Sequence, residues 1–274
     1  MTASERWASQ LAAWAIPDEI LRQAPESPWG FPVEPFRARA ARSADEASTS
    51  ISARRALETL PRGGTVLDVG SGAGAASLAL VPRAGAITAF DPSERMLEAF
   101  EELAGAAGVE HRAVLGSWPG DAGLAGPADV VVCHHVVNNA PDLGAFARAL
   151  GEHARRRVVI EMTAQHPRAW MNDMWMRFWS LERPDGPTSD DAERVLHDVG
   201  LDVRREDWAL QRQGVGPGEE AVASARRMLC LTPDRDPEVA EALGDRLWSD
   251  TDGRWFIGHR VQPVTTLWWD LRAG

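Results

Sequence analysis

The stretch that most constrains this chain is a short apolar run, residues 65–69, followed by glycines at alternate positions, Gly70, Gly72 and Gly74. The run predicts a buried strand, and residues 75–82 predict a helix after the glycines. Because glycine has no Cβ, the intervening loop can turn tightly and approach a ligand closely. A strand, a glycine loop and a helix N-terminus together present free backbone N–H groups to a bound anion. We therefore expect a ligand at this loop.

An acidic residue, Asp68, lies two positions before the first glycine. A loop that binds a dinucleotide must receive a doubly charged pyrophosphate, which a neighbouring carboxylate would repel. A ligand that carries an ammonium group as well as a carboxylate fits this mixed polarity better. The sequence therefore favours a zwitterionic ligand over a dinucleotide.

Composition limits the classes of function. The chain has 274 residues, enough for one full domain with insertions, and its 44% apolar and 25% charged residues are typical of a globular protein. The formal net charge of −11 disfavours nucleic acid and anionic membranes as partners. All 29 basic residues are Arg and there is no Tyr, which excludes lysine and tyrosine bases. GC-rich coding explains this bias and indicates a bacterial source.

Cysteines and hydropathy bear on metal binding and location. Cys133 and Cys230 are too few and too unpatterned for a disulfide framework or a zinc site, so we expect no metal. The first residues do not follow the pattern of a signal peptide, and no run of about 18 apolar residues occurs. We expect a cytoplasmic protein without a membrane span.

Beyond the glycine loop the chain alternates between short apolar strands and amphipathic helices. This alternation predicts a doubly wound, Rossmann-like α/β fold, whose parallel sheet binds ligands beyond the carboxyl ends of its strands. Before it, residues 4–25 predict one or two helices, and Ser43 with Glu46 forms a capping-box pattern for a helix to about Leu60. The predicted strands are 65–69, 86–90, 110–115, 129–133 and 157–162, and the predicted helices lie near 75–82, 93–105, 142–154 and 189–199.

Unusual residues follow several of these strands, where a ligand would lie. Asp91 ends the second strand, and a carboxylate there can accept hydrogen bonds from both hydroxyls of a ribose. The other strand ends carry Ser117 and Trp118 after the third strand, His134 and His135 after the fourth, and Glu161 at the end of the fifth.

Three motifs together carry a resemblance to a known family. They are residues 66–74, the group Asp91-Pro92-Ser93 with Met96, and the stretch that ends at 138–142 with Asn-Asn-Ala-Pro-Asp. Over roughly residues 45–212 the chain resembles class I S-adenosylmethionine-dependent methyltransferases. It looks like their small-molecule branch, because no Asn-Pro-Pro-Tyr or Asp-Pro-Pro-Tyr motif occurs.

The resemblance implies S-adenosylmethionine as the cofactor and S-adenosylhomocysteine as the product. It also implies a place for each matching residue. Asp68, Gly70, Ser71 and Gly72 would line the methionine moiety, Asp91 would hold the ribose hydroxyls, Pro92 and Met96 would pack near the adenine, and His134 would contact the cofactor.

One position departs from the family pattern. The residue after the third strand is commonly an Asp that binds the adenine amino group, whereas this chain has Ser117 there. Either the Ser117 hydroxyl or a backbone carbonyl takes that role, with Trp118 stacking on the base, or the equivalent position lies a few residues away.

The resemblance also divides the chain. Residues 1–42 would form an N-terminal helical and linker extension, and residues 43–212 the Rossmann-like cofactor domain, with a lid-like insert at 163–188. Residues 213–258 would form a helical insertion that is compatible with a substrate cap or with an oligomer contact such as a homodimer. Residues 259–274 would complete a seven-stranded, mostly parallel sheet as an antiparallel edge strand.

Candidate catalytic residues are His135 and His166, because the unperturbed pKa of histidine lies near neutrality. The competing interpretation is that one histidine sits in the sheet and the other orients a loop. Glu161 is a candidate base or an anchor for a substrate amine, and otherwise a hydrogen-bonded carboxylate at a strand end. These side chains lack a recognisable spacing of metal ligands.

The segment after the fifth strand is rich in Trp and Met. Read as a helix, it places Trp170, Met174, Trp175 and Phe178 on one wide apolar stripe. The stripe is equally compatible with core packing and with a lid over the methyl acceptor. From the N-terminal side, Trp29 in a Pro-rich linker is a candidate to close the same pocket.

We therefore predict a methyltransferase that acts on an O, N or S atom of a small-molecule acceptor. An NAD-dependent oxidoreductase on the same loop is the first alternative, and Asp68 speaks against it. A non-catalytic cofactor-binding module for interaction or regulation is the second, which the absent Asp after the third strand favours. An RNA methyltransferase is opposed by the net charge.

Overall fold

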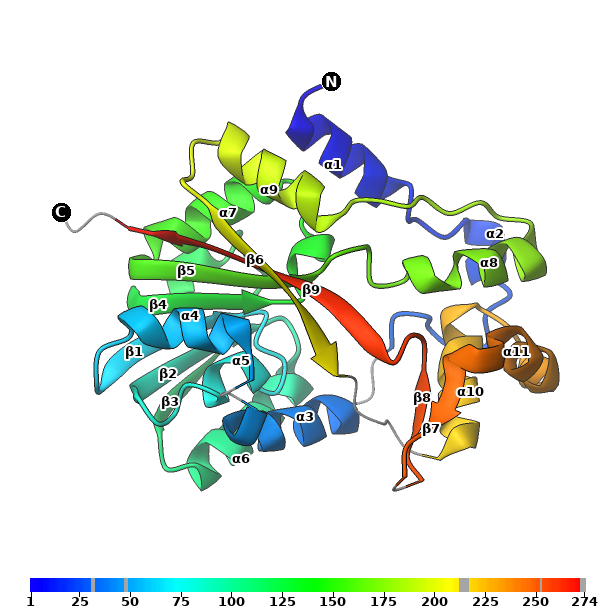
Figure 1. Ribbon diagram of the computed structural model, residues 1–274, viewed down its shortest axis with the longest axis horizontal. Helices are drawn as coiled ribbons and strands as arrows, with labels where there is room; N and C mark the ends of the chain where they lie inside the picture. Colours follow the sequence, from blue (N-terminus) through cyan, green and yellow to red (C-terminus); the bar gives the residue numbers. More distant parts are fainter. Residues whose placement is uncertain (31–32, 47–48, 212–216, 252, 272–274) are drawn as a thin grey trace.

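A seven-stranded sheet forms the centre of the molecule, in the strand order β3-β2-β1-β4-β5-β9-β6 (Figure 1). The computed structural model describes residues 1–30, 33–46, 49–211, 217–251 and 253–271. Strands β1 to β5 are parallel to one another, and β9 is antiparallel to both of its neighbours. The strands are β1 Gly64–Val69, β2 Ala84–Asp91, β3 Glu110–Leu115, β4 Ala128–His134, β5 Ala154–Thr163, β6 Arg204–Gln211 and β9 Val261–Asp270. The predicted Rossmann-like sheet with an antiparallel last strand is confirmed.

Helices cover both faces of this sheet. Along β4, Val131 and Cys133 face one apolar cluster and Val130 and Val132 face another, as the alternation of a strand requires. Residues of α1, α7 and α9 belong to the first cluster, and residues of α3, α4, α5 and α6 belong to the second. These helices are α1 Ala3–Ala12, α3 Val33–Glu46, α4 Ile51–Thr59, α5 Ala75–Leu78, α6 Glu94–Ala106, α7 Leu143–Glu152 and α9 Ser189–Asp198, with 3-10 turns η1 Ala122–Leu124 and η2 Val137–Asn139.

A smaller lobe, on the right of Figure 1, lies beyond the carboxyl ends of the strands. It joins parts of the predicted N-terminal extension, the predicted lid-like insert and the predicted helical insertion. Segments of these three regions, near residues 16–24, 170–181 and 221–257, share a third apolar cluster. Its elements are α2 Asp18–Leu21, η3 Ala169–Met171, α8 Asn172–Trp179, α10 Gly218–Met228, η4 Pro233–Arg235, α11 Asp236–Leu243, η5 Gly244–Arg246, β7 Leu247–Ser249 and β8 Trp255–Ile257. Within the described ranges, no helix is long and apolar enough to cross a membrane.

The C-terminal strand corrects one prediction. We expected residues 259–274 to form an edge strand, but β9 lies between β5 and β6, and β6 forms the edge. Residues 264–269 are buried one after another, with Trp268 in one apolar cluster and Trp269 in the other. A strand that is apolar on both faces gains most in an interior position, where both faces and both edges are covered.

The helix predicted from the capping-box pattern is a second correction. Ser43 lies inside α3, where its hydroxyl donates to the carbonyl of Ala40 at 2.7 Å. The next helix, α4, begins at Ile51, and the Ser50 hydroxyl accepts from the amide of Ala53. A serine within a helix can bond back to the preceding turn, so the same letters do not mark a helix start.

Helix α1 is held to the main sheet by Trp7. The Trp7 side chain is fully buried, and its Nε1 donates to the carbonyl of Ala140 at 2.8 Å. Ala140 follows β4 and η2, so this bond ties the N-terminal helix to the loop at the carboxyl end of a central strand.

We predict that Trp7→Ala lowers the free energy of unfolding by about 3–5 kcal/mol, the usual cost of deleting a buried aromatic side chain. The loss should be measured by urea denaturation of the ligand-free protein. Trp29→Ala is the matched control, because Trp29 is 49% exposed and its loss should cost within about 1 kcal/mol. Equal losses in the two variants would contradict this role of Trp7.

Candidate active site

The glycine loop after β1 touches the loop after β4. Gly70, Gly72 and Gly74 all have positive φ, at 69°, 51° and 90°. A Cβ on Gly70 would lie 2.3 Å from Cγ2 of Val136, so only glycine permits this approach. The helix that follows, α5, has only four residues, shorter than the predicted 75–82. The site is therefore built by two loops in contact rather than by one long helix.

Asp68 lies under the glycine loop and is buried. Its Oδ2 accepts from the amide of Ser77 at 3.2 Å and from the Ser77 hydroxyl at 2.6 Å. Its Oδ1 is buried and has no hydrogen-bond partner among the described residues. Burial raises the pKa of Asp68 to about 7 against the two Ser77 bonds, and the charge of Asp91 adds to the rise.

Asp91, at the end of β2, accepts a hydrogen bond from the same glycine loop. Its Oδ2 accepts from the amide of Gly72 at 2.8 Å, and its Oδ1 accepts from the amide of Ser93 at 2.9 Å. Burial raises the pKa of Asp91 above its ordinary value, against the effect of those two amides. The structure thus brings two of the predicted cofactor residues, Asp68 and Asp91, into electrostatic contact.

The residues after β3 are arranged differently from the prediction. The amide of Ser117 donates to Oδ2 of Asp121 at 2.8 Å, so an acidic side chain does lie in this loop, four residues later. The indole of Trp118 donates to the carbonyl of Phe146 and makes an edge contact with Phe90. Among the other predicted cofactor residues, Pro92 is exposed and Met96 is buried in α6.

A cluster of charged and polar side chains joins the ends of β4 and β5. Nε2 of His135 lies 2.9 Å from Oε1 of the buried Glu161, and Nδ1 of His134 lies 3.8 Å from Oε2. Arg39 of α3 completes the cluster, with Nη2 at 3.7 Å from Oε1 of Glu161. The prediction did not include Arg39, because only the tertiary fold brings α3 to these strand ends.

The charges of this cluster are set by burial and by its neighbours. Burial alone would raise the pKa of Glu161. The charge that His134 and His135 can carry, the His135 hydrogen bond and the guanidinium of Arg39 together hold that pKa below its ordinary value. Burial lowers the pKa of His134 to about 4, against the opposing pull of Glu161. His134 is therefore neutral near pH 7, and its Nε2 is buried with no partner among the described residues.

His135 has an unusual backbone conformation, with φ at 60°. A left-handed conformation is costly for a residue with a side chain and is more frequent at functional sites. Here the amide of His135 donates to the carbonyl of Glu161 at 2.7 Å, which holds the strained residue against β5. The same turn places the His135 side chain on the Glu161 carboxylate.

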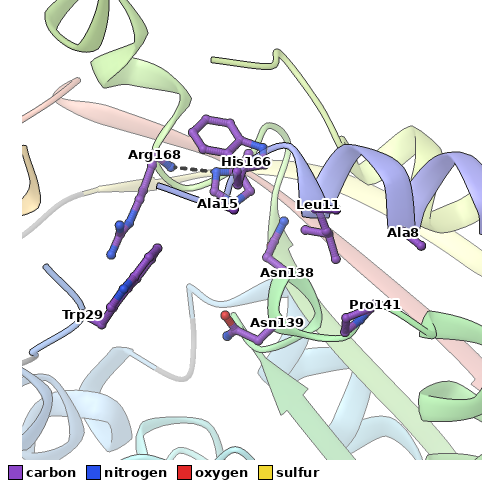
Figure 2. Close-up of a pocket in the computed structure, with 11 residues that line it drawn as sticks. Ala8, Leu11, Ala15, Trp29, Asn138, Asn139, Pro141, His166 and Arg168 are labelled. Carbon is purple, nitrogen blue, oxygen red and sulfur yellow. Dashed lines mark hydrogen bonds between the residues drawn. The ribbon is translucent and has the colours of Figure 1, made fainter. Parts of the chain in front are cut away.

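A cavity of about 330 Å³ lies beside these strand ends, between the main sheet and the N-terminal segment (Figure 2). In Figure 2, Trp29 and Arg168 form one wall, Leu11 and Ala8 of α1 lie on the other side, and Asn138 and Asn139 lie between them. Two of the predicted site residues, Trp29 and His166, thus lie at one cavity. The full lining is Ala8, Leu11, Ala12, Trp14, Ala15, Trp29, Asn138, Asn139, Pro141, His166 and Arg168.

His166 is held as a hydrogen-bond donor in this cavity. Its ring stacks on Trp14 with the centroids 3.7 Å apart, and its Nδ1 accepts from the amide of Arg168. Burial, with the charges of Arg168 and Arg183, lowers the pKa of His166 to about 3. The imidazole is therefore neutral near pH 7, and with Nδ1 accepting, its proton is on Nε2. Such a ring donates from Nε2 and is a poor base there.

Several cavity residues were not predicted as site residues. Trp14 belonged to a predicted helix, Asn138 and Asn139 were quoted only within a motif, and Arg168 carried no spacing signal. The side-chain nitrogen and oxygen of Asn138 are both buried without a partner among the described residues. The sequence did offer one signal for Asn138 as a site residue, because Asn138 and Asn139 form a polar pair shortly after a central strand.

The apolar stripe after β5 lies in the small lobe. Met174 and Trp175 are buried in its core, and Trp170 and Phe178 pack against that core. None of the four lines the cavity, whose lining is confined to other residues. The packing interpretation of the stripe accounts for these contacts. In the described part of the chain, no group of three or more His, Cys, Asp or Glu is arranged to hold a metal ion.

Comparisons with known proteins add to this geometry. The YcgJ protein from Bacillus subtilis has a solved structure that matches at 17% identity over 81% of this chain and 98% of that one, with a TM-score of 0.53. A protein from Galdieria sulphuraria described as a putative sarcosine dimethylglycine methyltransferase matches at 15% identity over 83% of this chain and 85% of that one, with a TM-score of 0.50. These matches show a shared fold. No curated protein matches the sequence significantly.

A family model carries the assignment further. The model, described as a methyltransferase domain, matches residues 41–206, which is more than half of the chain. The matched range contains the glycine loop, Asp91 and the His135–Glu161 pair, and it agrees closely with the predicted range of 45–212. The chain therefore belongs to the methyltransferase-domain family.

Proposed function

We propose that this methyltransferase transfers a methyl group to an O, N or S atom of a small-molecule acceptor bound in the cavity lined by Trp29, Asn138 and His166. S-adenosylmethionine is the methyl donor. The observation that carries the proposal is the contact of Gly70 with Val136. It sets the glycine loop directly against the loop after β4, in which Asn138 and Asn139, two and three residues after Val136, line the cavity.

The residues of the glycine loop fit S-adenosylmethionine. A Cβ on Gly72 would meet only Phe36, at 3.7 Å, so the backbone here is open to a ligand. Oδ1 of Asp68 is a buried acceptor without a partner among the described residues. Two neighbouring carboxylates, Asp68 and Asp91, suit a ligand with an ammonium and a sulfonium group, and they would repel a pyrophosphate.

Particular residues would then hold each part of the cofactor. Asp68 and the amides of Gly70 to Gly72 would line the methionine moiety, and Asp91 would accept from the ribose hydroxyls. Among the described residues, each Asp91 oxygen accepts one amide, which leaves a lone pair on each for a hydroxyl. His134 and Asn138 carry further buried polar atoms without partners among the described residues.

The chemistry needs a positioned acceptor and a route for its proton. When bound, S-adenosylmethionine supplies an electrophilic methyl group: the acceptor's lone pair forms the new bond, the carbon–sulfur pair returns to sulfur, and S-adenosylhomocysteine leaves. An acceptor O–H, N–H or S–H must also lose its proton. Positioning and exclusion of water supply much of the remaining rate.

His135 is the base that we propose for this proton. It is not itself a lining residue of the cavity, and it precedes the lining residue Asn138 by three positions. Hydrogen bonding to Glu161 at 2.9 Å places the ring proton on Nε2, which leaves Nδ1 with a free lone pair. The buried carboxylate also stabilises the imidazolium that forms when Nδ1 takes a proton. His166 acts instead as a donor to the acceptor, because its Nδ1 lone pair is already used.

The cavity supports a small acceptor rather than a nucleic acid. Its walls include α1 and Trp29, which enclose about 330 Å³, a size in the range of small-molecule sites. The net charge of −11 also opposes a polyanion. A cytoplasmic location and a homodimer stay predictions.

We predict that Asp91→Ala weakens binding of S-adenosylhomocysteine about 100-fold, because two hydrogen bonds to a charged group are lost. Isothermal titration calorimetry measures the loss. Glu94→Ala, three residues later on the exposed start of α6, is the matched control and should bind like the wild type. Unchanged affinity in Asp91→Ala would refute the assignment of Asp91 to the ribose.

The raised pKa of Asp68 predicts a pH-dependent stability of the ligand-free protein. Between the unfolded value of 3.8 and the folded value of about 7, the folded protein holds a proton that the unfolded chain releases. Stability therefore falls as pH rises through this window, by up to about 1.4 kcal/mol per pH unit. Asp68→Asn keeps a carbonyl for Ser77 and removes the titration.

Melting temperatures between pH 5 and pH 8 test this prediction. The stability of Asp68→Asn relative to wild type should increase with pH up to about 7 and then level off. Asp198→Asn, at an exposed site on α9, reports the effect of removing one carboxylate in general. A constant difference between wild type and Asp68→Asn across this range would count against a buried, titrating Asp68.

We predict that His135→Asn lowers kcat by about 100- to 10 000-fold for an O–H acceptor and leaves the affinity for S-adenosylhomocysteine unchanged. Asparagine is chosen because it tolerates the left-handed backbone at this position. Release of S-adenosylhomocysteine with an acceptor from a screen is the readout. His197→Asn, on the exposed side of α9, is the control. A full rate in His135→Asn would rule out this base.

A further inference from the structure

Arg168 is a partly buried cation at the cavity wall. Its guanidinium lies over the ring of Trp29 at 4.1 Å, and its Nη2 donates to the carbonyl of Pro28 at 3.1 Å. Its Nη1 is buried and has no hydrogen-bond partner in the described part of the chain. Among the described residues, none of the ion pairs joins Arg168 to a carboxylate. A guanidinium in this state lacks the anion that usually accompanies a buried charge.

A second cation, Arg183, increases the positive charge here. Its Nη1 and Nη2 donate to the backbone carbonyls of Ala15 and Trp14, and its guanidinium lies 5.0 Å from the rings of Trp14 and Trp175. These partners are neutral. Burial, and then the charge of Arg183, lower the pKa of Arg168 to about 10, so Arg168 is still charged near pH 7.

Among the described residues, no carboxylate lines the cavity to offset this charge. The described residues that line it are apolar, aromatic or neutral and polar, apart from Arg168, the one charged side chain among them. His166, neutral near pH 7, adds an Nε2–H donor, since its Nδ1 accepts from the Arg168 amide. In a chain with 40 acidic residues, an acid-free cavity beside two arginines favours an anionic ligand.

We infer that the acceptor is a planar aromatic carboxylate whose carboxylate is bound by Arg168 and His166. The inference rests on the proposed function, because it concerns the same cavity. Two donors, a guanidinium N–H and an imidazole N–H, match the two oxygens of a carboxylate. The aromatic ring follows from the walls. Trp29, which carries Arg168 over one face of its ring, lines the cavity together with the apolar side chains of Leu11 and Pro141.

This binding mode also orients the acceptor. Figure 2 shows Arg168 and Trp29 together on one side of the cavity and Asn138 between them and Leu11. Asn138 lies two residues after Val136, which contacts the glycine loop. With the carboxylate at Arg168, the opposite end of the ring points toward Asn138 and the cofactor side. The atom that receives the methyl group is therefore at the far end of the ring from the carboxylate.

Three probes with the same ring test the inference. Benzoate, benzamide and phenyl phosphate differ in charge and geometry, and saturation-transfer NMR can measure their dissociation constants on the full-length protein. We expect benzoate to bind at least about tenfold more tightly than benzamide. Arg168→Met should reduce that preference to less than about twofold without changing the affinity for benzamide.

Matched variants separate the effect of Arg168 from general charge and folding. Arg177→Met removes an arginine of α8 that pairs with Glu241 outside the cavity, and it should keep the full preference for benzoate. Arg168→Lys keeps the positive charge and should retain part of the preference, so the inference stays testable if Arg168→Met does not fold. Melting temperatures identify variants that fail to fold.

Three results would overturn the inference. Equal binding of benzoate and benzamide to the wild type, or an undiminished preference in Arg168→Met, would exclude an anion site at Arg168. Tighter binding of phenyl phosphate than of benzoate would overturn the carboxylate assignment. Titration of S-adenosylhomocysteine in parallel distinguishes the two proposals. Failure to bind it would refute the proposed function, whereas the probes report on Arg168 alone.

Discussion

The site depends on one contact that only glycine permits. Gly70 packs so closely against Val136 that a Cβ would lie 2.3 Å from the valine side chain. This contact joins the loop after β1 to the loop after β4, and through them it joins the two halves of the site. The carboxylates Asp68 and Asp91 lie on one side of it, and Asn138 and the cavity lie on the other. A side chain at position 70 would therefore push these two loops apart.

The charges of the site follow this division. The side of the glycine loop carries two carboxylates, Asp68 and Asp91, which suit a cationic donor. The cavity side carries Arg168 without a carboxylate in its lining, which suits an anionic acceptor. The pair of His135 and Glu161 lies at the strand ends where protons would be transferred.

Local patterns in the sequence predicted the part of the molecule that is built from consecutive residues. The glycine loop, Asp91 and the strands up to β5 depend on neighbours in sequence, so their residue types and spacing were sufficient. The position of β9 depends on pairing between distant strands, which no local pattern records. The environment of Arg168 likewise depends on distant contacts. Trp29, on which its guanidinium stacks, and Arg183, whose charge lowers its pKa, come from other segments of the chain. The apolar stripe around Trp175 was ambiguous, since cores and lids use the same residues.

The residues proposed to bind the cofactor and many of those that line the cavity come from different parts of the chain. The family match begins at residue 41, and it contains the glycine loop and the His135–Glu161 pair. More than half of the cavity lining, from Ala8 to Trp29, lies before that range. Trp7 holds this N-terminal segment on the sheet through the carbonyl of Ala140. Substitutions between Ala8 and Trp29 can therefore reshape the proposed acceptor cavity without touching the glycine loop or the proposed base His135. This separation would give acceptor specificity its own structural basis.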